Sequence, residues 1–273
     1  MQTEKYSLIV SDFDGTLLRS DEKIAGETLS AIDSFRSKGG NFALCTGRTL
    51  ASSLPIAKRL GLTGLVACFQ GSVVADIETG DLVVDGCIPK AGALEICRFM
   101  EELNVHYHVY DTYEYYSNLQ DEWLTHYERI VGVKAVVVDK EPLSSFVEKN
   151  NLRVRKLLVL LAPEDRARVY EALNKRFGGE YYVTYSAAFL VEVTNRDYSK
   201  ATALEKIAEY YGVPIEKTVA VGDSMNDLPM IRRAGLGIAV KNAEAALKEQ
   251  ADVAFDYSND ENAIGKIIEK YGL

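Results

Sequence analysis

The first quarter of the chain alternates between two patterns of apolar and polar positions. Short apolar runs over residues 6–10, 41–45 and 65–69 have the length and β-branched content of buried strands. Between them, apolar residues in 21–38 and 50–60 recur at the spacing of an amphipathic helix. Strand, helix and strand in this order predict right-handed crossovers and a parallel sheet, and therefore an α/β fold.

The pattern changes in the middle of the chain, where strands and helices no longer alternate regularly. We therefore expect an inserted α+β domain over residues 87–187, with residues 1–86 and 188–273 forming the two parts of one α/β domain. A strand at 189–193 is expected to return the chain to that first domain. The insertion is expected to hold helices at 91–103 and 163–177 and strands near 107–116, 135–138, 156–161 and 181–185. The first domain is expected to hold a hairpin at 73–77 and 82–84, helices at 201–211 and 227–234, and strands at 217–221 and 236–240.

Acidic residues follow two of the predicted strands. Asp12 and Asp14 come directly after the first strand, and Asp223 follows the strand at 217–221. The carboxyl ends of parallel strands meet at one edge of a sheet, where ligands bind. An isolated Asp-x-Asp is more often an acidic turn, but carboxylates that gather from separate strands favour a Mg²⁺ site.

A second group of residues at the same edge has the chemistry to hold an anionic oxygen. Thr46, Gly47 and Arg48 follow the second strand and supply a hydroxyl, backbone amides and a positive charge. Lys200 stands in the first turn of a predicted helix, with Ser199 as its N-cap. The N-terminal end of a helix carries partial positive charge and disfavours a cation, so Lys200 is expected to have an anionic partner.

The stretch Gly222-Asp-Ser-Met-Asn-Asp227 adds two more candidates. Asn226 can present its amide to a phosphate. We predict that Asp227 belongs to the metal site, where its carboxylate would orient either a metal-bound water or Lys200. Taken alone, this stretch is an ordinary capped helix start. Polar residues at the ends of four predicted strands or helices, taken together, favour a catalytic site.

The inserted domain holds most of the tyrosines and all three histidines. His106 and His108 alternate with apolar or aromatic neighbours, and we interpret them as one half-exposed face of a strand. Tyr110, Asp111 and Tyr113 are the candidates for contact with a substrate.

Composition restricts the classes of partner. The chain has 273 residues, a net charge of −9 and no long Lys/Arg run, which argues against binding along nucleic acid. No stretch approaches a transmembrane span, and the apolar run near the start is too short for a secretory signal. The four cysteines show no metal-binding spacing and are expected to be reduced, as in a cytoplasmic protein.

Four stretches together resemble the motifs of the haloacid dehalogenase (HAD) superfamily. They are Asp12-Phe-Asp-Gly-Thr16, Thr46-Gly-Arg48, Ser199-Lys200 and Gly222-Asp-Ser-Met-Asn-Asp227. The last motif and the position of the insertion resemble the Cof-type subfamily (class IIB) with a C2B cap. The resemblance implies a Rossmann-like core, a cap domain, dependence on Mg²⁺ and hydrolysis of small phosphomonoesters.

The resemblance also implies a role for each motif residue. Asp12 would be the nucleophile and Asp14 the general acid and base. Mg²⁺ would be held by Asp12, the backbone carbonyl of Asp14 and Asp223, and the phosphoryl group by Thr46, Lys200 and Asn226. Two positions depart from the family pattern, because Gln70 stands where asparagine is common and Ala201 where glycine is common. The first departure leaves the role of residue 70 open.

Two other functions remain open at this point. A phosphomutase or phosphotransferase with the same core would keep the phosphate instead of passing it to water. A non-catalytic sensor of phosphorylated ligands would need the pocket but not the nucleophile. We expect the substrate to be a sugar phosphate, and pyridoxal phosphate and flavin mononucleotide are the next candidates. The sequence indicates no oligomeric state.

Overall fold

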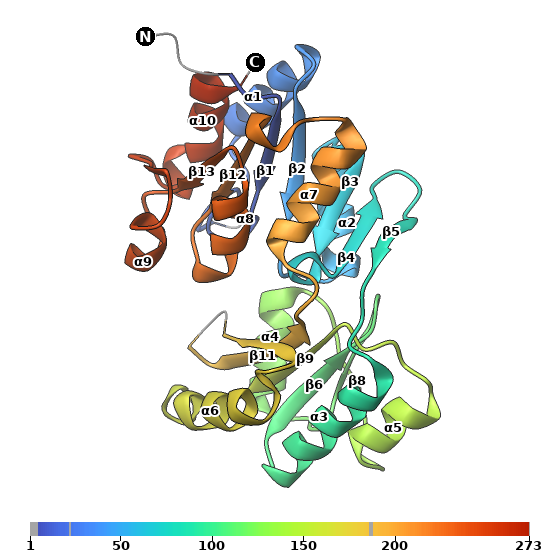
Figure 1. Ribbon diagram of the computed structural model, residues 1–273. Coiled ribbons are helices and arrows are strands. Elements are labelled where there is room, and N and C mark those ends of the chain that lie inside the picture. The colour runs from blue at the N-terminus through green and yellow to red at the C-terminus, as the bar shows by residue number, and fades with distance from the viewer. Residues whose placement is uncertain (1–4, 22, 186–187, 273) are drawn as a thin grey trace. The chain divides into compact units, whose positions relative to one another are not determined.

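The computed structural model describes residues 5–21, 23–185 and 188–272. The chain forms two compact units (Figure 1). The core unit consists of Met1–Gly47, Ser53–Val83 and Ser199–Leu273, and the insert unit consists of Arg48–Ser52 and Val84–Tyr198.

The core unit is built on an eight-stranded sheet in the order β14-β13-β12-β1-β2-β3-β4-β5. Its strands are β1 (Leu8–Ser11), β2 (Asn41–Cys45), β3 (Leu65–Cys68), β4 (Val73–Asp76), β5 (Leu82–Asp85), β12 (Thr218–Gly222), β13 (Leu236–Ala239) and β14 (Val253–Ala254). Neighbouring strands from β14 to β3 are parallel, and β4 runs antiparallel to β3. The predicted α/β fold with a parallel central sheet is confirmed.

Helices cover this sheet. They are α1 (Gly26–Ser37), α2 (Leu50–Arg59), α7 (Lys200–Tyr211), α8 (Leu228–Arg233), α9 (Ala245–Lys248) and α10 (Ala263–Tyr271). Helices α7 and α8 pack against each other, as do α1 and α10 (Figure 1). Helix α1 begins at Gly26 instead of Asp21, because the Asp21 carboxylate accepts a hydrogen bond from the Lys23 amide (3.3 Å) and forms a local turn. In the described part of the chain, no helix is long and apolar enough to cross a membrane.

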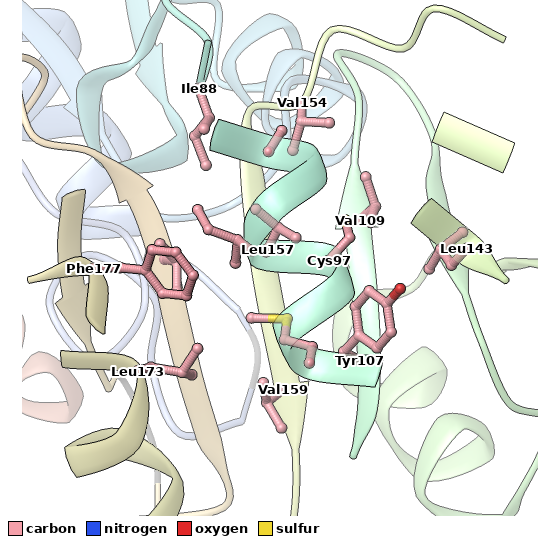
Figure 2. Close-up of a cluster of buried hydrophobic side chains, with 14 of the residues drawn as sticks. Ile88, Cys97, Tyr107, Val109, Leu143, Val154, Leu157, Val159, Leu173 and Phe177 are labelled. Atoms are coloured by element: carbon pink, nitrogen blue, oxygen red, sulfur yellow. The ribbon is translucent and has the colours of Figure 1, made fainter. Parts of the chain in front are cut away.

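The insert unit has a six-stranded sheet in the order β10-β11-β9-β6-β7-β8. Its strands are β6 (His106–Tyr110), β7 (Tyr115–Ser117), β8 (Val136–Val137), β9 (Lys156–Leu160), β10 (Tyr181–Thr184) and β11 (Leu190–Asn195), and its helices are α3 (Lys90–Glu102), α4 (Glu122–Val131), α5 (Leu143–Lys149) and α6 (Arg166–Phe177). One face of the sheet and helices α3, α5 and α6 enclose an apolar core. Figure 2 shows part of that core, including Tyr107 and Val109 of β6 and Leu157 and Val159 of β9.

Two expectations about the insertion are wrong. The strand predicted at 189–193 does not return to the first sheet, because β11 pairs antiparallel with β9 and β10 of the insert unit. The unit therefore extends to Tyr198, beyond the expected end at residue 187, which lies outside the described residues. His106 and His108 are buried instead of half-exposed.

Candidate active site

Three neighbouring strands deliver the candidate residues to one rim of the core sheet. Asp12 follows β1, and its amide donates a hydrogen bond to the carbonyl of Val221 in β12 (2.9 Å). Asp223 follows β12 directly. Thr46 follows β2, which is the other neighbour of β1. The three residues lie together because parallel strands end on the same side.

Lys200 joins this group through a contact with Asp12. It is the first residue of α7, and Ser199 is the N-cap, whose hydroxyl accepts a hydrogen bond from the Thr202 amide (3.3 Å). The Lys200 ammonium is fully buried and donates hydrogen bonds to carboxylate oxygens of Asp12 and Asp227. The predictions of a capping Ser199 and of an anionic partner for Lys200 are both confirmed.

Asp227 connects Lys200 to the loop after β12. One of its oxygens accepts the Lys200 hydrogen bond, and the other accepts hydrogen bonds from the backbone amides of Asp223 (2.9 Å) and Ser224 (3.1 Å). Both oxygens of this buried carboxylate are therefore engaged by protein groups. This arrangement favours the expectation that Asp227 orients Lys200.

Two hydroxyl groups hold the Asp223 carboxylate in place. Thr16 donates a hydrogen bond to one oxygen (2.8 Å), and Ser224 donates one to the other (3.1 Å). Gly15 permits this approach, since its φ is +76° and a Cβ there would lie 2.6 Å from the Asp223 oxygen. The roles of Thr16 and Ser224 were not anticipated, although both residues stand inside the motifs.

The electrostatics of the group are unbalanced. Asp12, Asp223 and Asp227 place three carboxylates around the single ammonium of Lys200. Burial raises the pKa of Asp12 well above its usual value, against the attraction of Lys200. Burial, together with Asp227, raises the pKa of Asp223 to about 6. Burial alone would lower the pKa of Lys200, but the adjacent Asp12 and Asp227 carboxylates raise it, so the lysine stays charged.

This set of donors fits a divalent cation. One carboxylate oxygen from each of Asp12, Asp223 and Asp227 lies within 4.8 Å of the others. Hard oxygen ligands and uncompensated negative charge are what Mg²⁺ requires. The Asp14 side chain is exposed, and among the described residues it is not part of this acidic group.

The candidate phosphate-binding residues include an unexpected neighbour. Thr46 is buried, and its carbonyl accepts a hydrogen bond from the Gln70 amide (3.1 Å). The Gln70 side chain lies against Gly47, and its Oε1 accepts a hydrogen bond from the side-chain nitrogen of Asn226 (3.2 Å). Gln70 therefore contacts three of the predicted positions.

The remaining candidates belong to the insert unit. Arg48 groups with this unit by its contacts. The Tyr110 hydroxyl is buried and donates a hydrogen bond to Tyr127 (2.7 Å). The Asp111 carboxylate is partly buried and accepts a hydrogen bond from the following backbone amide (2.6 Å), and Tyr113 is 58% exposed. Substrate contact by Tyr110, Asp111 and Tyr113 stays a prediction.

A buried polar chain in the same unit was not anticipated. Asp121 accepts a hydrogen bond from Nδ1 of His106 (2.9 Å), so Nε2 of the neutral His106 ring is an acceptor, with Ser117 (2.9 Å) and His108 (3.2 Å) beside it. Burial lowers the pKa of both histidines, which therefore stay neutral. Alternation along the strand predicted that the histidines share a face, but it could not show that Asp121 would meet them.

Comparison with known proteins gives the class of protein that carries this rim. A family model described as haloacid dehalogenase-like hydrolase matches residues 9–268. The chain therefore belongs to the haloacid dehalogenase-like hydrolases, and the resemblance seen in its motifs is confirmed.

Particular relatives extend over nearly the whole chain. The 5-amino-6-(5-phospho-D-ribitylamino)uracil phosphatase YcsE of Bacillus subtilis is 30% identical over 97% of this chain and 96% of its own. YitU, a phosphatase of the same name and organism, is 26% identical over 99% of both chains. The crystal structure of TM0651 from Thermotoga maritima superposes with a TM-score of 0.85 at 28% identity, over 98% of both chains. The chain is thus an enzyme of the phosphatase class.

Proposed function

We propose that this protein is a Mg²⁺-dependent phosphatase that hydrolyses small phosphomonoesters through an aspartyl-phosphate on Asp12. The observation that carries the proposal is the position of the Asp12 carboxylate. It is buried, it contacts the Lys200 ammonium, and it lies within 4.8 Å of the Asp223 carboxylate. A carboxylate attacks a phosphate dianion only when positive charge offsets their repulsion.

In this proposal Asp12, the backbone carbonyl of Asp14 and Asp223 hold the Mg²⁺ ion. When bound, the ion supplies positive charge that offsets the negative charge of the carboxylates and the phosphate. Asp227 belongs to the acidic group, and we assign it the orientation of Lys200 because both of its oxygens already accept hydrogen bonds.

The other residues of the rim bind the phosphoryl group. The Thr46 hydroxyl, the Lys200 ammonium and the Asn226 amide donate hydrogen bonds to its oxygens, and the backbone at Gly47 adds amide donors. Donors that are fixed in place before the reaction stabilise the charge that spreads over these oxygens in the transition state.

The reaction has two steps that use the same pair of aspartates. An Asp12 oxygen attacks phosphorus, the ester P–O bond breaks, and Asp14 gives its proton to the leaving alkoxide. Water then attacks the aspartyl-phosphate, Asp14 takes a proton from that water, and the P–O bond to Asp12 breaks. Inorganic phosphate leaves, Asp12 is again a free carboxylate, and Asp14 is again protonated.

For the substrate we propose phosphorylated sugars and related polyols. YcsE and YitU are phosphatases of a compound whose phosphate stands on a ribityl chain, which supports a hydroxyl-rich alcohol. Tyr110, Asp111 and Tyr113 are the proposed contacts to that alcohol, and Arg48 adds positive charge for the phosphate.

The cysteines in the described residues are free thiols, which agrees with a cytoplasmic protein.

The replacement Asp12→Asn tests the nucleophile. We expect it to abolish Mg²⁺-dependent phosphate release from p-nitrophenyl phosphate while the circular dichroism spectrum stays unchanged. Asp33→Asn, at an exposed site on α1, is the matched control and should keep full activity. Turnover by Asp12→Asn at near the wild-type rate would show that Asp12 is not the nucleophile. With a sugar phosphate as the substrate, an isomerised product in place of free phosphate would favour the phosphomutase alternative.

A further inference from the structure

The loop after β3 has an unusual backbone. Phe69, Gln70 and Gly71 all have positive φ, at 50°, 59° and 98°. Glycine adopts this region without penalty, and asparagine tolerates it better than other residues with a side chain. Glutamine has no such preference, so Gln70 holds a conformation that its own chemistry disfavours. Backbone strain of this kind persists where the surroundings enforce it and often marks a functional site.

The surroundings of Gln70 are three segments of the candidate active site. Its amide donates a hydrogen bond to the carbonyl of Thr46 (3.1 Å). Its Oε1 accepts a hydrogen bond from Nδ2 of Asn226 (3.2 Å). Its Nε2 lies 2.6 Å from the place that a Cβ on Gly47 would occupy, so a side chain at residue 47 would require the Gln70 amide to move. With 7% of its surface exposed, Gln70 fills the space between these segments.

The contact with Asn226 decides which way that amide points. A primary amide has nearly the same shape after a half-turn, so its hydrogen-bond partners fix where the donor and the acceptor lie. The Oδ1 atom of Asn226 is buried and has no hydrogen-bond partner among the described residues. In the observed orientation, the Gln70 oxygen is the hydrogen-bond partner of the Asn226 amide. It engages one N–H of Nδ2 and leaves the other for a ligand.

We propose that Gln70 is a positioning residue that holds the Asn226 amide with its donor toward the phosphoryl group. The inference rests on the proposed function, since it assigns Asn226 to that group. The length of the side chain explains why glutamine stands in a strained backbone. Asparagine would fit the backbone better but is shorter by one C–C bond, about 1.5 Å, and would not reach Asn226.

The test is a double-mutant cycle with Gln70→Asn and Asn226→Ser in the full-length protein. For Gln70→Asn we expect kcat/KM for p-nitrophenyl phosphate to fall about five- to tenfold, the range for one lost orienting hydrogen bond. The affinity for inorganic phosphate in the presence of Mg²⁺, measured by calorimetry, should fall by a similar factor. The melting temperature should stay the same or rise, because asparagine relieves the backbone. Gln250→Asn, in the loop after α9, makes the same chemical change outside the site and should alter none of these values.

The cycle separates positioning from general structural support. In the Asn226→Ser background, Gln70→Asn should cause no further loss of kcat/KM or of phosphate affinity. Equal losses in both backgrounds would overturn the inference, and so would an unchanged kcat/KM in Gln70→Asn. If the wild-type protein released no phosphate from any ester, the proposed function would fail separately. The phosphate affinities of the four proteins would still decide whether Gln70 acts through Asn226.

Discussion

Replacing Lys200 with methionine tests whether the rim depends on one buried cation. Methionine keeps much of the length and the apolar stem of lysine but removes the charge. The ammonium contacts Asp12 and Asp227, and both carboxylates are buried. Breaking a buried ion pair by removing one partner costs about 3–5 kcal/mol, because the other partner stays behind as an uncompensated charge. We expect a loss of this size in the free energy of unfolding of the metal-free protein at pH 8.

The loss should depend on pH in a defined direction. Burial already raises the pKa of Asp12 and, to about 6, that of Asp223. A carboxyl group whose folded pKa is raised favours the folded state at low pH, and this contribution is lost as the pH rises through the folded pKa. Without Lys200 the raised pKa values go higher still, so protonation at pH 5 relieves part of the repulsion. The destabilisation by Lys200→Met should therefore be smaller at pH 5 than at pH 8.

Urea denaturation followed by circular dichroism in the presence of a chelator gives both values. Lys206→Met is the matched control, because Lys206 lies on the same helix, is exposed and pairs only at the surface with Glu209. It should change the free energy of unfolding by no more than about 0.5 kcal/mol. A loss of less than about 1 kcal/mol for Lys200→Met at pH 8, or an equal loss at both pH values, would refute the reasoning.

Two further predictions concern other parts of the molecule. Protons and Mg²⁺ compete for Asp12 and Asp223, whose pKa values burial raises, so the Mg²⁺ affinity measured by calorimetry should rise with pH between pH 5 and pH 8, by up to about tenfold per pH unit for each group that must lose a proton. A constant affinity from pH 5 to pH 8 would contradict this. Asp121→Ala removes the acceptor of hydrogen bonds from the Leu124 amide (2.8 Å) and His106 (2.9 Å), and should cost about 2 kcal/mol of unfolding free energy. Asp121→Asn can still cap α4 and should cost less, and equal losses would show that the cap contributes nothing.

The rim of the candidate active site could be predicted because it follows from general rules of parallel sheets. Asp12, Thr46 and Asp223 each come directly after a short apolar run, and strands β2, β1 and β12 end on the same side. The helix dipole predicts an anionic partner for Lys200, and the structure provides Asp12 and Asp227. These inferences need only strand order and the charge of the residue.

Other features depend on tertiary contacts that local pattern does not contain. The segment of β11 alternates in a way that fits either sheet, so its pairing with β9 could not be read from it. The family pattern marked Gln70 as a departure, but its contact with Asn226 joins residues 156 positions apart. The contact between His106 and Asp121 likewise depends on how β6 meets the start of α4.

The interrupted core unit has a consequence for the order in which the protein forms during synthesis. Thr16 and Asp223 are 207 positions apart, and the whole of Val84–Tyr198 leaves the ribosome between them. Apart from Arg48–Ser52, the insert unit is this one continuous stretch, which holds its own apolar core and can fold as soon as it emerges. The N-terminal strands meanwhile wait with the β12 side of β1 unpaired. The candidate active site is therefore among the last parts of the protein to be assembled, and a nascent chain that stalls before residue 218 lacks it.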